Sequence, residues 1–529
     1  MGVALALCVS GLLLGGSSVS AADGNLDSSF GTAGKVISNM ADTIQGADRA
    51  NDIAINPDGS FLVVGYKTVS YDFVIAKYLS SGVLDSSFGT NGRVVTSFGT
   101  GADVATSVEI LSNGSFVVAG TSSIGGQDDF AVAKYTASGV LDTAFGTAGK
   151  VTTDMSGNLR GDSVSTMAIS KTGEVYVAGY SRGSTIDLAV VKYTSAGVLD
   201  TSFSSDGIVA IDFFSSQDDA RTIQVLTNGS IVVGGYAING NGDSVSALVK
   251  LTSSGELDQA FGAGGKITGD YVNYDEEVSS VSISAAGEIF AAVTGVDFTV
   301  VKYSSSGVLQ TTFGTSGIAA TDFSSGTDYS SCVQVLVDGS VLVSGFATIS
   351  GSADFAVAKF SSAGILDNTF GISGRSTVSF TSGDDISAAL AVGVNGQIML
   401  AGTADSNGAQ SDFAIAKFQG GVPVVATTTT TTSTTSIVSS PTTAPVVAKS
   451  IVPLITRNYV TAISMARYAK LSVPTGSKVT LKVYSSAAKR CRVSGTRIRK
   501  SKAGTCLVKV TVRTKNGRSK SAAAKIRFK

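Results

Sequence analysis

Short hydrophobic patterns separated by glycine-centred turns run through most of the chain. In one representative stretch, Ile53 and Ile55 are apolar alternates ahead of a turn at Gly59, and an apolar run covers residues 61–64. A third apolar-rich run covers residues 72–78, and a fourth follows a nearby glycine. Alternation with a period of two indicates a half-buried strand, and a short continuous apolar run indicates a strand buried on both faces. Each such unit is therefore predicted to contain four strands.

This unit occurs seven times. An anchoring phenylalanine recurs at steps of 58, 57, 58, 58, 52 and 57 residues, at Phe30, Phe88, Phe145, Phe203, Phe261, Phe313 and Phe370. A turn glycine recurs with it, at Gly59, Gly114, Gly173, Gly229, Gly287, Gly339 and Gly396. Seven four-stranded units at this period predict an all-β fold, a seven-bladed β-propeller over residues 23–420.

The two ends of the repeat region are complementary. Gly34–Asn39 has the pattern of a fourth strand, whereas the last unit, residues 385–418, ends after its third run. We therefore predict that the N-terminal strand completes the last blade, which closes the ring and removes an exposed sheet edge. A non-closing solenoid is the alternative.

The repeat pattern has a recognisable signature. Leu-Asp-x-x-Phe-Gly, as at Leu26–Gly31, is followed by an Asp-Gly or Asn-Gly turn and by a strand such as Asp129–Tyr135. This signature resembles the delta-60 repeat family, a bacterial β-propeller repeat family of largely undefined function. The resemblance implies the propeller fold and an exported bacterial protein, and it implies no reaction.

Acidic residues recur at two positions of the unit. One set begins the innermost strand and is predicted to form a ring at one mouth of the central channel: Asp48, Asp103, Asp162, Asp218, Glu276, Asp328 and Asp385. A second set begins the third strand, at Asp72, Asp129, Asp187, Asp297, Asp354 and Asp412, and is expected on the same face. The functional interpretation is a cation site or a surface for a basic partner. The structural interpretation, which we favour, is that each acid caps loop backbone N–H groups.

The chain lacks the alternating Asp/Asn signature of a calcium loop with a distal Glu. It contains no His, which excludes Ser-His-Asp catalysis and His-ligated metals. We therefore expect no metal, no other cofactor and no catalytic residues. Adjacent acids such as Asp218-Asp219 do not form an acid/base pair by adjacency alone, because neighbours on a strand point to opposite faces.

A lysine of the third strand recurs in every unit, at Lys77, Lys134, Lys192, Lys250, Lys302, Lys359 and Lys417. The aspartates of the Leu-Asp pattern are its predicted partners, at Asp27, Asp85, Asp142, Asp200, Asp258 and Asp367. We interpret these as structural ion pairs. In the sixth unit the aspartate is replaced by Gln310, so the pairing is not obligatory there.

Charge is divided unequally along the chain. Residues 448–529 contain 21 Lys and Arg and no Asp or Glu, whereas the first 447 residues contain 18 basic and 40 acidic residues. A Thr/Ser/Pro-rich linker, residues 421–447, separates the two parts. Such asymmetry favours an anionic partner for residues 448–529.

The C-terminal part is predicted to be a small β-sandwich-like domain that resembles immunoglobulin-like modules of exported bacterial proteins. Cys491 and Cys506 are its predicted disulfide. Its basic patch comprises Lys489, Arg490, Arg492, Arg497, Arg499, Lys500 and Lys502. We expect it to bind an anionic cell-envelope polymer or another acidic surface, with nucleic acid disfavoured by export. Docking onto the acidic body of the same or a neighbouring chain is an alternative.

The N-terminus has the features of a secretory signal. An apolar segment at residues 3–14, too short to span a bilayer, precedes small residues suited to cleavage near Ala22. Residues 1–22 are therefore predicted to be a signal peptide, and no transmembrane segment is expected. We predict a non-catalytic, exported cell-surface binding or scaffold protein, whose propeller displays a recognition face toward an unidentified ligand or protein. The alternative is a carbohydrate-active enzyme, a hydrolase or lyase, that uses Asp residues at the propeller mouth.

Overall fold

The computed structural model describes residues 7–8, 23–40, 47–68, 70–155, 157, 161–271, 275–324, 326–405 and 411–420, and the strands of the C-terminal region. The chain divides into two compact units, Met1–Thr429 and Thr430–Lys529. All regular structure in the described residues is β-strand, and none of it is a helix able to cross a membrane.

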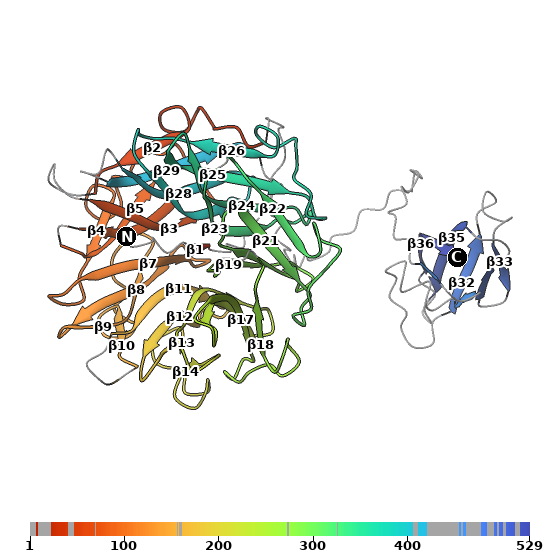
Figure 1. Cartoon of the computed structure of the whole chain (residues 1–529), viewed down its shortest axis with the longest axis horizontal. Coiled ribbons are helices and arrows are strands. Elements are labelled where there is room, and N and C mark those ends of the chain that lie inside the picture. Colours follow the sequence, from red (N-terminus) through yellow and green to blue (C-terminus); the bar gives the residue numbers. More distant parts are fainter. Residues whose placement is uncertain are drawn as a thin grey trace, which may run out of the picture. The chain divides into compact units, whose positions relative to one another are not determined.

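The first unit contains seven four-stranded antiparallel blades arranged as a ring (Figure 1). Blade 1 comprises β3 (Asp48–Ile55), β4 (Phe61–Lys67), β5 (Phe73–Tyr78) and β6 (Arg93–Thr96), and blade 2 comprises β7 (Asp103–Ile110), β8 (Phe116–Ile124), β9 (Gln127–Tyr135) and β10 (Lys150–Thr153). Blade 3 comprises β11 (Ser163–Ile169), β12 (Val175–Arg182), β13 (Ile186–Tyr193) and β14 (Ile208–Ile211). Blade 4 comprises β15 (Asp218–Val225), β16 (Ile231–Ile238), β17 (Ser244–Leu251) and β18 (Lys266–Gly269).

The remaining blades repeat this order. Blade 5 comprises β19 (Val278–Ile283), β20 (Ile289–Val293), β21 (Phe298–Tyr303) and β22 (Ile318–Thr321), and blade 6 comprises β23 (Asp328–Val335), β24 (Val341–Ile349), β25 (Ser352–Phe360) and β26 (Arg375–Val378). Blade 7 comprises β27 (Asp385–Val392), β28 (Ile398–Asp405), β29 (Ser411–Phe418) and the N-terminal β2 (Lys35–Ser38). The seven-bladed propeller predicted from the repeats is confirmed.

Closure of the ring follows the predicted route. Strand β2 pairs antiparallel with β29, with Lys35 opposite Ala416 and Ser38 opposite Phe413. The first and last parts of the repeat region therefore share one blade, and the solenoid alternative is excluded.

The backbone conformation at the first turn of each blade favours glycine. In blade 1 the hairpin between β3 and β4 closes with Gly59 N–H donating to Asn56 O at 2.9 Å, and Gly59 has φ +85°. A positive φ is strained for residues with a side chain, so glycine is favoured at this turn.

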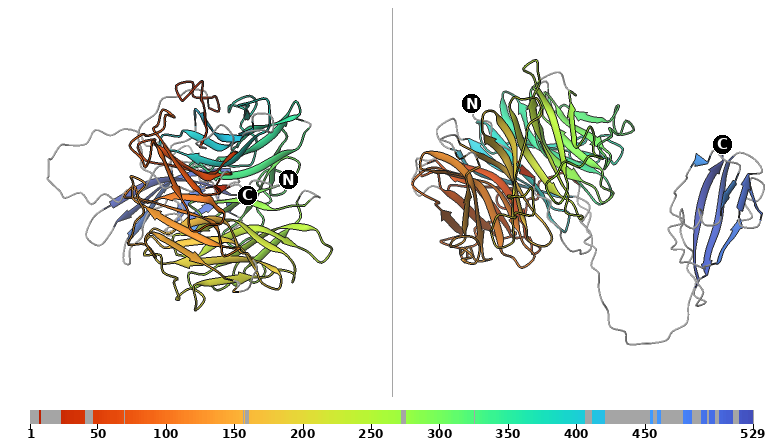
Figure 2. Two further views of the ribbon diagram at one scale, coloured as in Figure 1. Left: turned by 90° about the vertical axis from the view of Figure 1, so that its left-hand side faces the viewer. Right: turned by 90° about the horizontal axis from the view of Figure 1, so that it is seen from below.

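The hydrophobic core is divided among the seven interfaces between neighbouring blades, each of which contains its own cluster of buried residues. Between blades 1 and 2, for example, Val64 and Ile75 pack in one cluster with Val108 and Val118. Two further views show the sheets of neighbouring blades packed face against face (Figure 2). The middle strands are buried on both faces, as their continuous apolar runs predict.

A short segment near the N-terminus lies among the innermost strands. Strand β1 (Leu7–Cys8) pairs in parallel with β27 and lies close to β3, β15, β19 and β23. Blade 7 therefore has a fifth strand at its inner edge. The rest of the predicted signal peptide, and the linker at 421–447, lie outside the described residues.

The second unit contains two sheets. One has the order β30 (Leu454–Ile455), β36 (Ser519–Phe528), β35 (Gly504–Arg513) and β32 (Lys478–Val483), and the other has the order β31 (Tyr459–Thr461), β34 (Arg497–Lys500) and β33 (Cys491–Ser494). Its side chains lie outside the described part of the structure. The immunoglobulin-like assignment, the basic patch and the disulfide between Cys491 and Cys506 stay predictions.

Candidate functional site

The seven acids that begin the innermost strands are buried and bind backbone. The carboxylates of Asp103, Asp218 and Asp328 each accept the N–H of a loop residue, Phe98, Phe213 and Phe323 respectively, at 2.7 Å. The other four acids accept backbone N–H groups in the same way: Asp48 from Met40, Asp162 from Met155, Glu276 from Tyr271 and Asp385 from Phe380. Each acid thereby fixes the loop that arrives from the preceding blade.

Strand register brings the second acidic set to the same end of the blades. In blade 2, Asp103 lies opposite Ser122, which in turn lies opposite Asp129. In blade 7, Asp385 and Asp412 are related through Ala404 in the same manner. The acids of a blade's first and third strands therefore lie in one row across the sheet.

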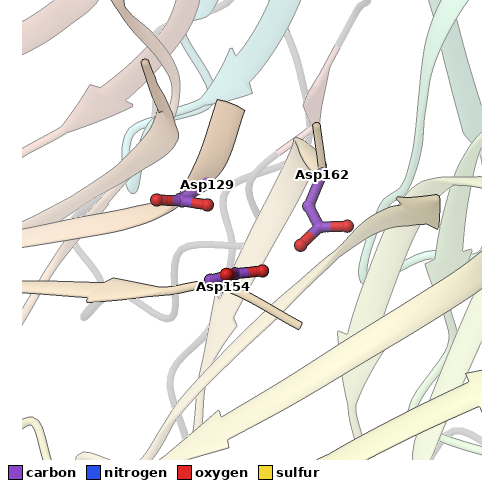
Figure 3. A group of neighbouring side chains, drawn as sticks. All are labelled: Asp129, Asp154 and Asp162. Carbon is purple, nitrogen blue, oxygen red and sulfur yellow. The ribbon is translucent and has the colours of Figure 1, made fainter. Parts of the chain in front are cut away.

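A third position, which sequence reasoning missed, completes the geometry. It is the residue after the fourth strand, and it lies between the third-strand acid of its own blade and the first-strand acid of the next. We call each such set a junction, numbered by its first blade. Junctions 2, 3 and 5 are all-aspartate: Asp129, Asp154 and Asp162 (Figure 3), then Asp187, Asp212 and Asp218, then Asp297, Asp322 and Asp328. In each, one carboxylate oxygen per residue lies within 4.8 Å of the other two.

The acids of these junctions repel one another. Burial raises the pKa of Asp129 to about 6, and Asp154 and Asp162 add to the shift. Burial also raises the pKa of Asp218 to about 6, with Asp212 and Asp187 contributing. The middle member of each junction is exposed, so the sites open to solvent.

The other junctions carry a neutral residue in one of the three places. The corresponding sets are Asp72, Ser97 and Asp103; Ser246, Asp270 and Glu276; Asp354, Ser379 and Asp385; and Asp412, Asn39 and Asp48. Here a hydrogen-bond donor replaces a carboxylate. Ser246 donates to Glu276 at 3.1 Å, and hydrogen bonds from Ser379 and Asn39 partly offset the burial that raises the pKa of Asp354 and Asp412.

The third-strand lysines lie in a repeated ionic and aromatic environment. Lys192 Nζ lies 2.7 Å from a carboxylate oxygen of Asp200 and 5.9 Å from the centre of the Phe203 ring. The same lysine–aspartate pair occurs in blades 1, 2, 4, 6 and 7, and the lysine lies over the anchoring phenylalanine in every blade. Where Gln310 replaces the aspartate, Lys302 pairs with Glu288 at 3.0 Å instead.

One charged cluster breaks the seven-fold symmetry. Each first strand contains a β-bulge, and the bulged residues are Asn51, Thr106, Ser165, Arg221, Ser279, Ser331 and Ala388. Arg221 alone among them is charged. It lies 3.0 Å from Asp219 and 2.8 Å from Glu277, and Tyr329 donates to Glu277 at 2.7 Å. This cluster joins the first strands of blades 4, 5 and 6.

The cluster contains a buried carboxyl group with a raised pKa. Asp219 is 3% exposed, and burial raises its pKa to about 7 although Arg221 acts in the opposite direction. Asp219 pairs with Arg221, whereas its neighbour Asp218 accepts the N–H of Phe213. The sequence places these two acids side by side but does not reveal the arginine between Asp219 and Glu277.

Cys332 is fully buried in the core between blades 6 and 7.

Comparison with known families places the repeats. Five segments, residues 56–88, 111–145, 171–203, 226–261 and 338–370, match a family model described as a domain of unknown function (DUF5122) β-propeller. The matches support assigning these repeats to a β-propeller repeat family, and the narrower delta-60 assignment stays a prediction. No curated protein matches the chain significantly.

Several solved structures resemble the chain. They include the extracellular domain of a proposed hybrid two-component system from B. thetaiotaomicron (10% identity, TM-score 0.39), for which the similarity covers 94% of this chain and 57% of that one. Sqt1 from Chaetomium thermophilum has 12% identity and a TM-score of 0.39, with 71% and 97% coverage. An ulvan lyase, a polysaccharide lyase, has 11% identity and a TM-score of 0.41, with 71% and 94% coverage. These similarities carry no inference about activity.

Proposed function

We propose that this chain is a non-catalytic binding protein of the cell exterior. Its propeller displays a recognition face, and residues 448–529 attach it to an anionic polymer of the cell envelope. The observation that carries the proposal is the separation of charge, with 21 basic and no acidic residues in the C-terminal part. A surface of one sign attracts polymers of the other by long-range electrostatics.

The repeated ionic groups of the propeller support a scaffold rather than a catalyst. The acids that begin the innermost strands hold the loops between blades through hydrogen bonds to backbone N–H groups. The third-strand lysine forms a salt bridge with an acidic residue in every blade. A group held in the same bond in each blade has a structural role that accounts for its repetition.

Attachment is tested by co-sedimentation of the full-length chain with a purified anionic wall polymer, beside a chain ending at Thr429. At low salt we expect the full-length chain to sediment and the shortened chain to stay in solution. Binding should fade as salt rises, because screening weakens exposed charge interactions. Replacing Arg497, Arg499 and Lys500 together by Gln should weaken binding roughly a hundredfold, since each such charge near an anionic surface contributes about 1 kcal/mol.

The matched control replaces the exposed propeller residue Lys171 by Gln and should bind like the wild type. Equal sedimentation of the full-length and shortened chains would contradict attachment through the C-terminal unit. Salt-sensitive self-association without polymer binding would instead make the acidic propeller the partner of that unit.

One observation favours a second candidate function, a carbohydrate-active enzyme. The Arg221 cluster places two carboxylates and a tyrosine around one guanidinium, and the pKa of Asp219 is about 7. A carboxyl group that titrates near neutrality is suited to general acid/base chemistry. Asp219→Asn is the substitution that separates this candidate from the first.

A further inference from the structure

The all-aspartate junctions 2, 3 and 5 bring three carboxylates together at the meeting point of two blades. In junction 2, Asp129 and Asp154 come from blade 2 and Asp162 precedes β11 of blade 3 (Figure 3). One oxygen from each residue lies within 4.8 Å of the other two. Calcium binds oxygen at about 2.3–2.6 Å, so oxygens on opposite sides of one ion lie about 4.8 Å apart. All three oxygens can therefore contact a single calcium ion.

Buried oxygens without a partner provide a second, independent observation. Asp218 and Asp328 are fully buried, and Oδ1 of each has no hydrogen-bond partner. Asp129 is 9% exposed, and no donor among the described residues reaches its carboxylate. A buried carboxylate oxygen without a donor or cation is costly, so these atoms indicate a missing electropositive partner.

The chain contains its own comparison. Asp103, Asp354 and Asp412, in junctions 1, 6 and 7, also have an unpartnered Oδ1, yet only two carboxylates meet in each of these junctions. Where only two carboxylates meet, such an oxygen can be satisfied by water. Three converging carboxylates are not satisfied in this way, because water does not remove their mutual repulsion.

The described basic residues near junctions 3 and 5 form no salt bridge with their carboxylates. Lys266 approaches junction 3, but its Nζ donates to the backbone oxygen of Asp212, at 2.5 Å. Near junction 5, Arg375 donates to the hydroxyl of Thr321, at 2.7 Å. Within the described residues, no salt bridge reaches the carboxylates of junctions 3 and 5.

We propose that junctions 2, 3 and 5 each bind one divalent cation, with calcium the best fit. Carboxylate oxygens are hard ligands of the kind calcium prefers, and the exposed middle aspartate leaves room for waters to complete its coordination. Magnesium fits less well, because it demands near-ideal octahedral geometry and gives up its waters reluctantly, whereas calcium accepts a flexible set of carboxylate ligands. The bound ion joins the third and fourth strands of one blade to the first strand of the next.

The test titrates calcium into the EDTA-treated full-length chain by isothermal titration calorimetry, with magnesium present throughout. We expect three equivalents for the wild type. Asp322→Ser gives junction 5 the serine found in junctions 1 and 6, and it should reduce binding to two equivalents. Ser97→Asp gives junction 1 the residue set of junction 3, and it should raise binding to four.

Asp270→Ser is the matched control, because Asp270 is an exposed residue after a fourth strand whose junction contains Ser246 in place of the third-strand acid. Its stoichiometry should stay at three. All three substitutions lie on exposed residues, and equal thermal unfolding in EDTA shows that each variant folds. Absence of calcium binding, displacement of calcium by equimolar magnesium, or three equivalents in Asp322→Ser would each overturn the proposal.

Discussion

A chain that begins at Met40 is expected to fail to close its propeller, whereas a chain that begins at Asp23 is expected to form it. The shorter chain lacks β2, which pairs with β29, and it lacks Phe30, which is fully buried between blades 7 and 1. It also lacks Asp27, the partner of Lys417 at 3.1 Å. Removing one buried Phe costs about 3–5 kcal/mol, and the whole net stability of a domain is about 5–15 kcal/mol.

The measurement compares near-UV circular dichroism and size-exclusion chromatography of the two chains. The chain that begins at Met40 should lose cooperative thermal unfolding and associate through the exposed edge of β29. A chain that keeps Asp23 and ends at Thr429 is the control for truncation itself and should unfold cooperatively. A monomeric, cooperatively unfolding chain that begins at Met40 would show that closure by β2 is dispensable.

Phe203→Ala is expected to destabilise the propeller by about 3–5 kcal/mol. The Phe203 ring is fully buried in the core between blades 3 and 4, packs edge-on against Tyr176 at 6.0 Å, and lies under Lys192. The substitution leaves a cavity and removes the aromatic surface beneath the Lys192–Asp200 pair.

Urea unfolding of the full-length chain, followed by fluorescence of its tyrosines, measures this effect. Val198→Ala is the matched control, because Val198 is 61% exposed in the same repeat and its truncation should change stability by less than about 0.5 kcal/mol. Similar unfolding midpoints for the two variants would mean that the recurring phenylalanine does not anchor the blade.

The fold could be predicted from the sequence because its signals are local and repeated. Alternation at Ile53 and Ile55, the turn at Gly59 and the recurring Phe30 each report the conformation of a few neighbouring residues, and seven copies remove ambiguity. Closure could be predicted as well, because Gly34–Asn39 has the pattern of the strand missing from the last unit.

The candidate site was only partly predictable, because its contacts depend on loops. Both acidic sets were found from their recurrence, but the middle position is Asp in only four of the seven repeats, among them Asp154 and Asp212, and Ser or Asn in the other three. This position follows each anchoring phenylalanine by nine residues, so a repeat alignment contains it, but its mixed composition does not mark it as acidic, and the folded chain is what places it at a junction. The partner of Lys302 was missed because Glu288 lies just before β20 and outside the Leu-Asp pattern that supplies the partner in the other blades.

Glycan turnover by the full-length chain tests most directly whether this is a binding protein or an enzyme. New reducing ends and new unsaturated uronate groups are measured for acidic and neutral polysaccharides, at pH values around the pKa of Asp219, about 7. Asp219→Asn is compared with Asp243→Asn, an exposed aspartate of the same blade. The binding role predicts no turnover by the wild type or either variant. Turnover by the wild type and Asp243→Asn that is lost in Asp219→Asn would contradict it and establish catalysis at the Arg221 cluster.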